Sequence, residues 1–144
     1  MAFPSTHTTI TELDTTDVDF TFTVTRTGSL VGTSTINWKT SASSATDISD
    51  FDQTSGLVTF LNGESSKSVT IKVKGDTLVE ANESFSIELH TPGAGSTISS
   101  TTGSINAQII NQDIDLTPTS TNLIVSEGDA SNGQFVFTVT RSGD

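Results

Sequence analysis

The sequence predicts an all-β protein, a seven-stranded Greek-key sandwich of two sheets. Three observations support this class: several segments alternate apolar and polar side chains, Gly- and Asn-containing turns separate them, and long tracts of the helix formers Ala, Leu, Glu and Lys are missing. A period of two buries one face of a strand and leaves the other face in water. Seven short strands at this spacing are typical of a two-sheet sandwich.

The clearest alternation lies in DVDFTFTVTR, residues 17–26, where Val and Phe alternate with Asp and Thr. The segments KSVTIKVK (67–74) and ESFSIELH (83–90) repeat the pattern. Four less regular segments complete the set. In chain order, we predict strands at 8–11, 17–27, 33–40, 56–61, 67–74, 83–91 and 103–111.

The predicted connections contain the residues that turns require. Gly28, Asn62-Gly63 and the segment 92–95 allow the positive φ of tight turns. The segment 41–55 is longer than most connections in a small sandwich and contains three Asp residues, so we expect it to carry function. The single Trp, Trp38, lies on the predicted strand 33–40 and is expected to pack in the core or at a sheet edge.

A repeat divides the chain. The sequence FTVTR at 22–26 recurs at 137–141, and ten of the 23 positions of 6–28 are identical 115 residues later. Such a period is the sign of a tandem array of whole domains. We therefore predict a complete repeat at 1–115 and, at 116–144, a truncated start of the next repeat with only its first two strands. The chain is expected to be a piece of a longer protein, since the residues after Met1-Ala2 form no apolar run and no signal peptide is visible.

The composition argues against several classes of partner. Seventeen Asp and Glu face six Lys and Arg, a net charge of −11. This balance argues against nucleic acid and anionic membranes, which need a basic surface. No apolar run approaches the ~20 residues of a membrane span. The absence of Cys excludes disulfides and thiolate sites. A cation is the natural partner, although acidity alone can also serve solubility.

The positions of the acidic residues favour the cation. In an antiparallel sandwich, the ends of alternate strands and the tail after the last strand share one pole. Twelve carboxylates of the first repeat fall there: Glu12, Asp14, Asp17, Asp19, Asp47, Asp50, Asp52, Asp76, Glu80, Glu83, Asp113 and Asp115. Carboxylates at this density repel one another, and a hard cation with six to eight oxygen ligands removes the repulsion. The alternative is that these loop acids are solvated and bind nothing.

The sequence contains only weak candidates for a catalytic group of residues. His7 and His90 lie far apart in sequence, and no Ser stands with a matching His and Asp. Carboxylate pairs could serve glycoside hydrolysis, but one Trp and no Tyr leave little to line a sugar cleft. We expect no catalytic residues, no organic cofactor and no enzymatic activity.

Three segments together resemble the Calx-beta domain family: FTFTVTRTGSL, FDQTSGLVTFLNGESSKSVTIKVKGDTLVEANESFSIEL and SINAQIINQD. The resemblance spans residues 6–115 and extends into the second repeat. It implies an immunoglobulin-like sandwich, found in the calcium-sensing domains of sodium/calcium exchangers and in arrays of bacterial surface and secreted proteins. By position, it implies calcium ligands at Glu12, Asp50, Asp76, the backbone carbonyl of Leu78, Glu80, Glu83 and Asp113.

Three departures from the family pattern suggest one or two calcium ions and a weaker site. Ala42 stands where an acid is expected, Leu13 replaces a Gly, and the tail 111–113 keeps one acid. We therefore expect a calcium-stiffened structural repeat of a larger extracellular or cell-surface protein, with a bacterial source favoured. A regulatory calcium sensor, a metal-free adhesive or spacer module and an accessory module of an enzyme remain alternatives.

The expected partners are neighbouring repeats of the same chain. The second-repeat segment is more apolar than its counterpart in the first repeat, with Leu123 and Ile124 where the first has Thr8 and Thr9. It could therefore replace that counterpart in another molecule and form a strand-swapped homo-oligomer through residues 121–141. The alternative is that this segment makes no ordered contact.

Overall fold

Strands alone form the regular structure of the chain in the computed structural model, which describes residues 1–4, 7–118 and 138–142. The strands in this part of the chain are β1 (His7–Thr11), β2 (Val18–Thr25), β3 (Ser34–Ala42), β4 (Ser55–Phe60), β5 (Ser66–Val73), β6 (Glu83–His90), β7 (Ser104–Ile110), β8 (Asp115–Pro118) and β9 (Val139–Ser142). The first seven confirm the predicted strands to within two residues at each end. The described part contains no helix long and apolar enough to span a lipid bilayer.

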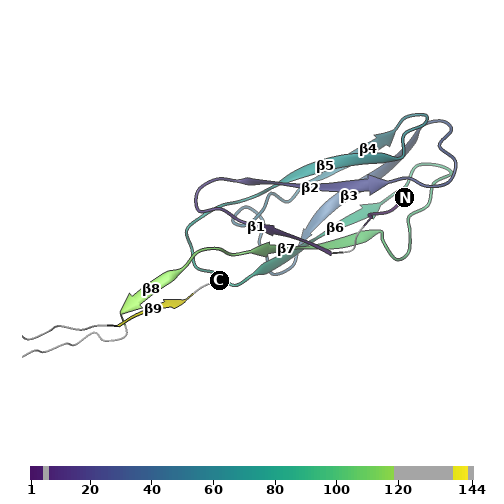
Figure 1. Cartoon of the computed structure of the whole chain (residues 1–144). Helices are drawn as coiled ribbons and strands as arrows, with labels where there is room; N and C mark the ends of the chain where they lie inside the picture. Colours follow the sequence, from purple (N-terminus) through teal and green to yellow (C-terminus); the bar gives the residue numbers. More distant parts are fainter. Residues whose placement is uncertain (5–6, 119–137, 143–144) are drawn as a thin grey trace, which may run out of the picture.

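Two sheets form the sandwich. The larger sheet has the order β1-β7-β6-β3-β4, and β2 pairs with β5 in the other layer. All pairs in these two sheets are antiparallel except β1 with β7, which run parallel in the register His7↔Asn106 to Thr11↔Ile110. The β2–β5 ribbon covers one face of the larger sheet (Figure 1). The parallel pair brings the end of β1 and the end of β7 to the same pole.

The core lies between the two layers. Aromatic pairs cross it: Phe20 packs edge-on against Phe85 with ring centroids 5.7 Å apart, and Phe22 against Trp38 at 5.3 Å. Trp38 is buried, which confirms its predicted packing role. Burying each such side chain contributes about 1.5–3 kcal/mol. The inward positions of the alternating segments therefore account for the sandwich.

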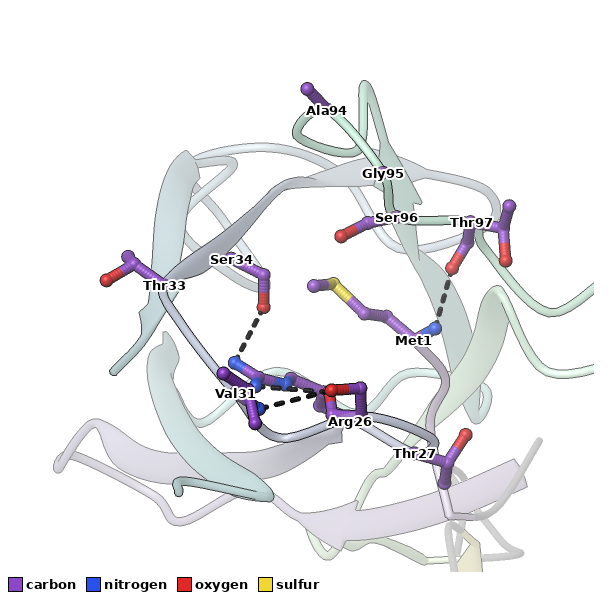
Figure 2. A pocket seen from close by; sticks show the side chains of 11 residues that line it. Met1, Arg26, Thr27, Val31, Thr33, Ser34, Ala94, Gly95, Ser96 and Thr97 are labelled. Carbon is purple, nitrogen blue, oxygen red and sulfur yellow. Dashed lines mark hydrogen bonds between the residues drawn. The ribbon is translucent and has the colours of Figure 1, made fainter. Parts of the chain in front are cut away.

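The first pole, where β2 ends and the N-terminus lies, holds a cavity of about 300 Å³ (Figure 2). Arg26 reaches into its wall and is only 6% exposed. Its guanidinium donates to the carbonyl oxygens of Ser29 and Gly32, both at 3.2 Å, and to Ser34 Oγ at 2.9 Å. These bonds tie the β2–β3 connection to β3, so we assign Arg26 a structural role.

At the opposite pole the chain leaves β7 and continues into β8, which pairs with β9 (Figure 1). The predicted first strand of the second repeat, near 123–126, lies outside the described residues, as does most of the segment 121–141. The carboxylates that the sequence predicts as calcium ligands gather at this pole, which we call the acidic pole.

Candidate metal centre

Glu12 is the first carboxylate of the acidic pole in chain order and directly follows β1. Its backbone N–H donates to the Ile110 carbonyl at 3.2 Å, which continues the β1–β7 pairing by one residue. Its side chain is 4% exposed, and its Oε1 accepts a hydrogen bond from Asn111 Nδ2 at 2.7 Å. Burial of a carboxylate is costly unless it has hydrogen-bond donors or a cation nearby. Glu12 has one donor in the described structure.

The segment between β3 and β4 delivers Asp50 to the pole. Phe51 is fully buried and stacks on Phe85 of β6, with ring centroids 4.5 Å apart. It also forms a backbone bridge with Val73, and the Lys74 N–H donates to the Asp50 carbonyl at 2.9 Å. The predicted loop 41–55 is thus partly paired with the end of β5, a feature that the sequence did not indicate.

The carboxylate of Asp50 is held by its own segment. Its Oδ2 accepts hydrogen bonds from the backbone N–H of Thr46 at 2.5 Å and from the Thr46 hydroxyl at 2.8 Å. Thr46 was not among the predicted site residues. Its signal in the sequence is weak, since Thr is common throughout the chain.

The segment between β5 and β6 contains the predicted ligands Asp76, Leu78 and Glu80. Gly75 permits a close approach of two segments, because a Cβ there would lie 2.0 Å from the Leu13 carbonyl oxygen. Next to it, Asp76 Oδ1 accepts a hydrogen bond from the Leu78 N–H at 2.7 Å. The Leu78 carbonyl in turn accepts from Asn111 Nδ2 at 2.9 Å.

Three carboxylates form the tightest group at the pole. One oxygen from each of Asp50, Glu80 and Glu83 lies within 4.8 Å of the others. Calcium binds oxygen ligands at about 2.3–2.6 Å, so oxygens on opposite sides of one ion are about 5 Å apart. The spacing of these three oxygens therefore fits a single calcium ion between them.

Charge repulsion and burial perturb the glutamates of the pole. Burial raises the pKa of Glu12 to about 7, reinforced by the charges of Asp76 and Glu80. Burial likewise raises the pKa of Glu83 to about 7, reinforced by its hydrogen bond with Asp50. The same causes, burial and neighbouring carboxylates, raise the pKa values of Glu80 and Asp113. Without metal, these four carboxylates therefore release their protons at a higher pH than isolated carboxylates do.

Asp50 behaves in the opposite way. Burial opposes its ionisation, but hydrogen bonds from Thr46 and Glu83 outweigh burial and lower its pKa. These opposite pKa shifts favour the charge on Asp50 and the proton on Glu83. A cation that binds between them would compete with this proton.

The six carboxylates predicted as calcium ligands differ in their partners from other acids of the predicted group of twelve. Asp19 pairs with Lys72 at 2.5 Å, and Lys74 bridges Asp17 at 3.2 Å and Asp52 at 3.0 Å. Asp47 and Asp14 accept hydrogen bonds from the Gln53 N–H and from Gln112. The five ion pairs among the described residues include none of Glu12, Asp50, Asp76, Glu80, Glu83 and Asp113.

All seven residues that the sequence predicted as ligands thus lie around one pole, and three of them share one ion-sized space. The donor set consists of oxygens alone, which suits a hard divalent cation. Asp113 adds a further sign of fit: its Oδ2 is shielded from solvent and has no hydrogen-bond partner among the described residues. Asn111, which the sequence presented only as a lost acid, contacts two of the predicted ligands.

Comparisons with known proteins identify the family and the fold. The family model of the Calx-beta domain matches residues 1–114. Similar solved structures include an apo-form Calx CBD1 domain, 25% identical, with a TM-score of 0.72 over 78% of this chain and 96% of that chain. A search of curated proteins finds no match.

Two further structures contain a CBD12 unit. The calcium-binding domain CBD12 of CALX1.1 is 24% identical, with a TM-score of 0.71 over 81% of this chain and 49% of that chain. CBD12 from CALX1.2 is 24% identical, with a TM-score of 0.73 over 96% of this chain and 55% of that chain. This chain therefore spans about half the length of each CBD12 chain. With its family model matched over most of its length and its sandwich shared with these structures, the chain belongs to the Calx-beta domain family.

Proposed function

We propose that this domain is a calcium-binding structural repeat of a larger extracellular or cell-surface protein, acting by binding and not by catalysis. The observation that carries the proposal is the group of Asp50, Glu80 and Glu83, whose oxygens lie within 4.8 Å of one another. The match to the Calx-beta family and the name of the related calcium-binding domain CBD12 support the same ion.

Calcium would act by joining segments that are distant in sequence. Asp50 comes from the β3–β4 segment, Glu80 from the β5–β6 segment, and Glu83 from the start of β6. Their mutual repulsion destabilises the metal-free pole, and a divalent cation among them removes it. The bound ion should therefore stiffen the acidic pole, and with it the junction to the residues that follow β7.

The register of β8 with β9 supports the proposed tandem arrangement. Thr117 pairs with Thr140 in this ribbon, and Ala2 pairs with Thr25 in the first repeat. Both partners are shifted by the same 115-residue period. We therefore propose that a second repeat begins near residue 116 and directly follows the acidic pole, so that neighbouring repeats are the first partners of this domain.

A strand-swapped homo-oligomer through 121–141 is the alternative use of this segment. The β8–β9 pairing joins the two described ends of the second-repeat segment to each other. Light scattering distinguishes the two arrangements. A monomer at high protein concentration supports the tandem proposal, and dimers that disappear when the chain is cut after Asp115 support the exchange.

The extracellular location is proposed from the number and openness of the calcium ligands. A site with few protein ligands at an open pole suits the weak affinities of extracellular calcium modules, about 10⁻⁴–10⁻³ M. A dissociation constant below about 1 μM, coupled to a conformational change, would instead indicate a regulatory sensor. Secretion is tested by locating the parent protein in fractionated cells.

Calorimetric titration of the full chain with calcium tests the proposal. We expect saturable binding, which Glu80→Gln weakens at least tenfold and Glu64→Gln leaves unchanged. Glu64 is a matched control because it lies in the β4–β5 turn, paired with Lys67 at 2.7 Å. Magnesium should bind more weakly, since it requires a smaller octahedral site. Absence of calcium binding would refute the proposal and leave a metal-free adhesive or spacer module.

A further inference from the structure

Asn111 joins the segments that surround Glu12. It directly follows β7 and is 2% exposed. Its Nδ2 donates to Glu12 Oε1 at 2.7 Å and to the Leu78 carbonyl at 2.9 Å. Its own N–H donates to Asn82 Oδ1, and its Oδ1 accepts from the Asp113 N–H, both at 3.0 Å. These three polar groups of Asn111 therefore make four hydrogen bonds at the acidic pole.

Nδ2 lies where a cation bound by Glu12 and by the Leu78 carbonyl would lie. The two oxygens that it contacts come from different segments and are both among the predicted calcium ligands. The nitrogen of a side-chain amide carries two hydrogens with partial positive charge and does not accept hydrogen bonds. It therefore supplies positive potential to both oxygens at once. A calcium ion would bind such oxygens at about 2.3–2.6 Å and would need the same space.

We propose that the Asn111 side-chain amide takes the place of a second calcium ion at the acidic pole and limits the domain to one ion, held by Asp50, Glu80 and Glu83. This inference rests on the calcium-binding function proposed above and specifies its stoichiometry. Glu12 and the Leu78 carbonyl are then structural acceptors and not calcium ligands in this chain.

The neighbours of Asn111 show what an aspartate at this position would do. An Asp has the same shape but only acceptor atoms, so it would face Glu12 without a donor. It would also lie near Asp113, whose Oδ2 already lacks a hydrogen-bond partner among the described residues. Without metal this arrangement is repulsive, and with metal it offers several oxygens to a second ion.

Calorimetry and metal analysis after equilibrium dialysis test the proposal on the full chain, with calcium alone as the probe. We expect one calcium per chain for the wild type and two for Asn111→Asp. The matched control Asn111→Ala removes the two hydrogen bonds and adds no ligand, so it should still bind one. In chelator, both variants should melt below the wild type, and calcium should restore Asn111→Asp more than Asn111→Ala.

The outcomes separate this inference from the proposed function. Two calcium ions on the wild type, or one on a folded Asn111→Asp variant, would overturn the role of Asn111 while calcium binding stands. No calcium on the wild type would overturn both. If Asn111→Asp does not fold even with calcium, the wild-type stoichiometry decides, since two bound ions are incompatible with an amide in the second position.

Discussion

Lowering the pH should stabilise the metal-free domain, the reverse of what most carboxylate-rich surfaces do. Burial and neighbouring acids raise the pKa values of Glu12 and Glu83 from 4.5 to about 7. Between pH 4.5 and 7, the folded chain holds protons that the unfolded chain has released. The free energy of unfolding therefore falls as the pH rises through this window.

The magnitude follows from the size of the two shifts. One pKa unit corresponds to about 1.4 kcal/mol, so each glutamate alone would contribute about 3 kcal/mol between pH 8 and pH 5. The two groups repel each other, and protonation of one relieves the other, so their contributions are not additive. Partial access of solvent to Glu83 screens its share further. We expect a total gain of about 2–4 kcal/mol at pH 5 relative to pH 8.

Urea unfolding in chelator, followed by tryptophan fluorescence, measures this difference. Trp38 is the only Trp in the chain and is buried between the sheets, so the fluorescence signal reports unfolding of the β1–β7 sandwich. The double variant Glu12→Gln and Glu83→Gln should lose most of the dependence on pH. Saturating calcium should also reduce it, because the ion holds the Glu83 carboxylate in its ionised form. Equal or lower stability at pH 5 than at pH 8 in chelator would refute the electrostatic account of the pole.

Three substitutions probe how the pole is supported. Phe51→Ala should cost about 3–5 kcal/mol by urea unfolding and weaken calcium binding, because the buried ring anchors Asp50; unchanged affinity would show that Asp50 needs no anchor. Gly75→Ala should lower stability by about 1–3 kcal/mol, since its Cβ would overlap the Leu13 carbonyl; a neutral result would contradict this close approach. Ile48→Asn should raise stability by about 1 kcal/mol, because Ile48 has a φ of 83° and a 79% exposed side chain; a loss would show that its side chain makes a needed contact.

The fold could be predicted from the sequence because its main signal is local. The alternation in 17–26, 67–74 and 83–90 marks which side chains face the core, and each of these segments forms a strand of the sandwich. Turn residues gave the limits of the strands, as at Gly63, which has a φ of 86°. These features depend on neighbours in sequence and not on distant contacts.

The pairing within 41–55 could not be predicted, because it depends on tertiary packing. Phe51 is one aromatic residue in a polar segment, and nothing in its immediate sequence identifies Phe85 as the ring on which it stacks. The same limit applies to the sorting of the twelve acids. Asp19 is neutralised by Lys72 because the β2–β5 register places them opposite each other, and a single sequence does not give that register.

Asn111 shows a different limit. In the sequence it stands where the family resemblance implies a carboxylate, so the sequence alone indicates a lost ligand. The structure shows its amide as a donor to Glu12 and to the Leu78 carbonyl. Residue identity alone reports the missing charge. Only the geometry reports that the amide supplies positive potential in its place.

A calcium titration of the full chain followed by backbone amide NMR tests the central claim most directly, because it measures both binding and location. The account predicts saturable shifts concentrated at Thr46, Asp50, Glu80 and Glu83, with little change at Gly63 in the β4–β5 turn. It would be contradicted by the absence of saturable shifts. Shifts centred on the lysine-paired acids Asp17 and Asp19, in place of these residues, would contradict it equally.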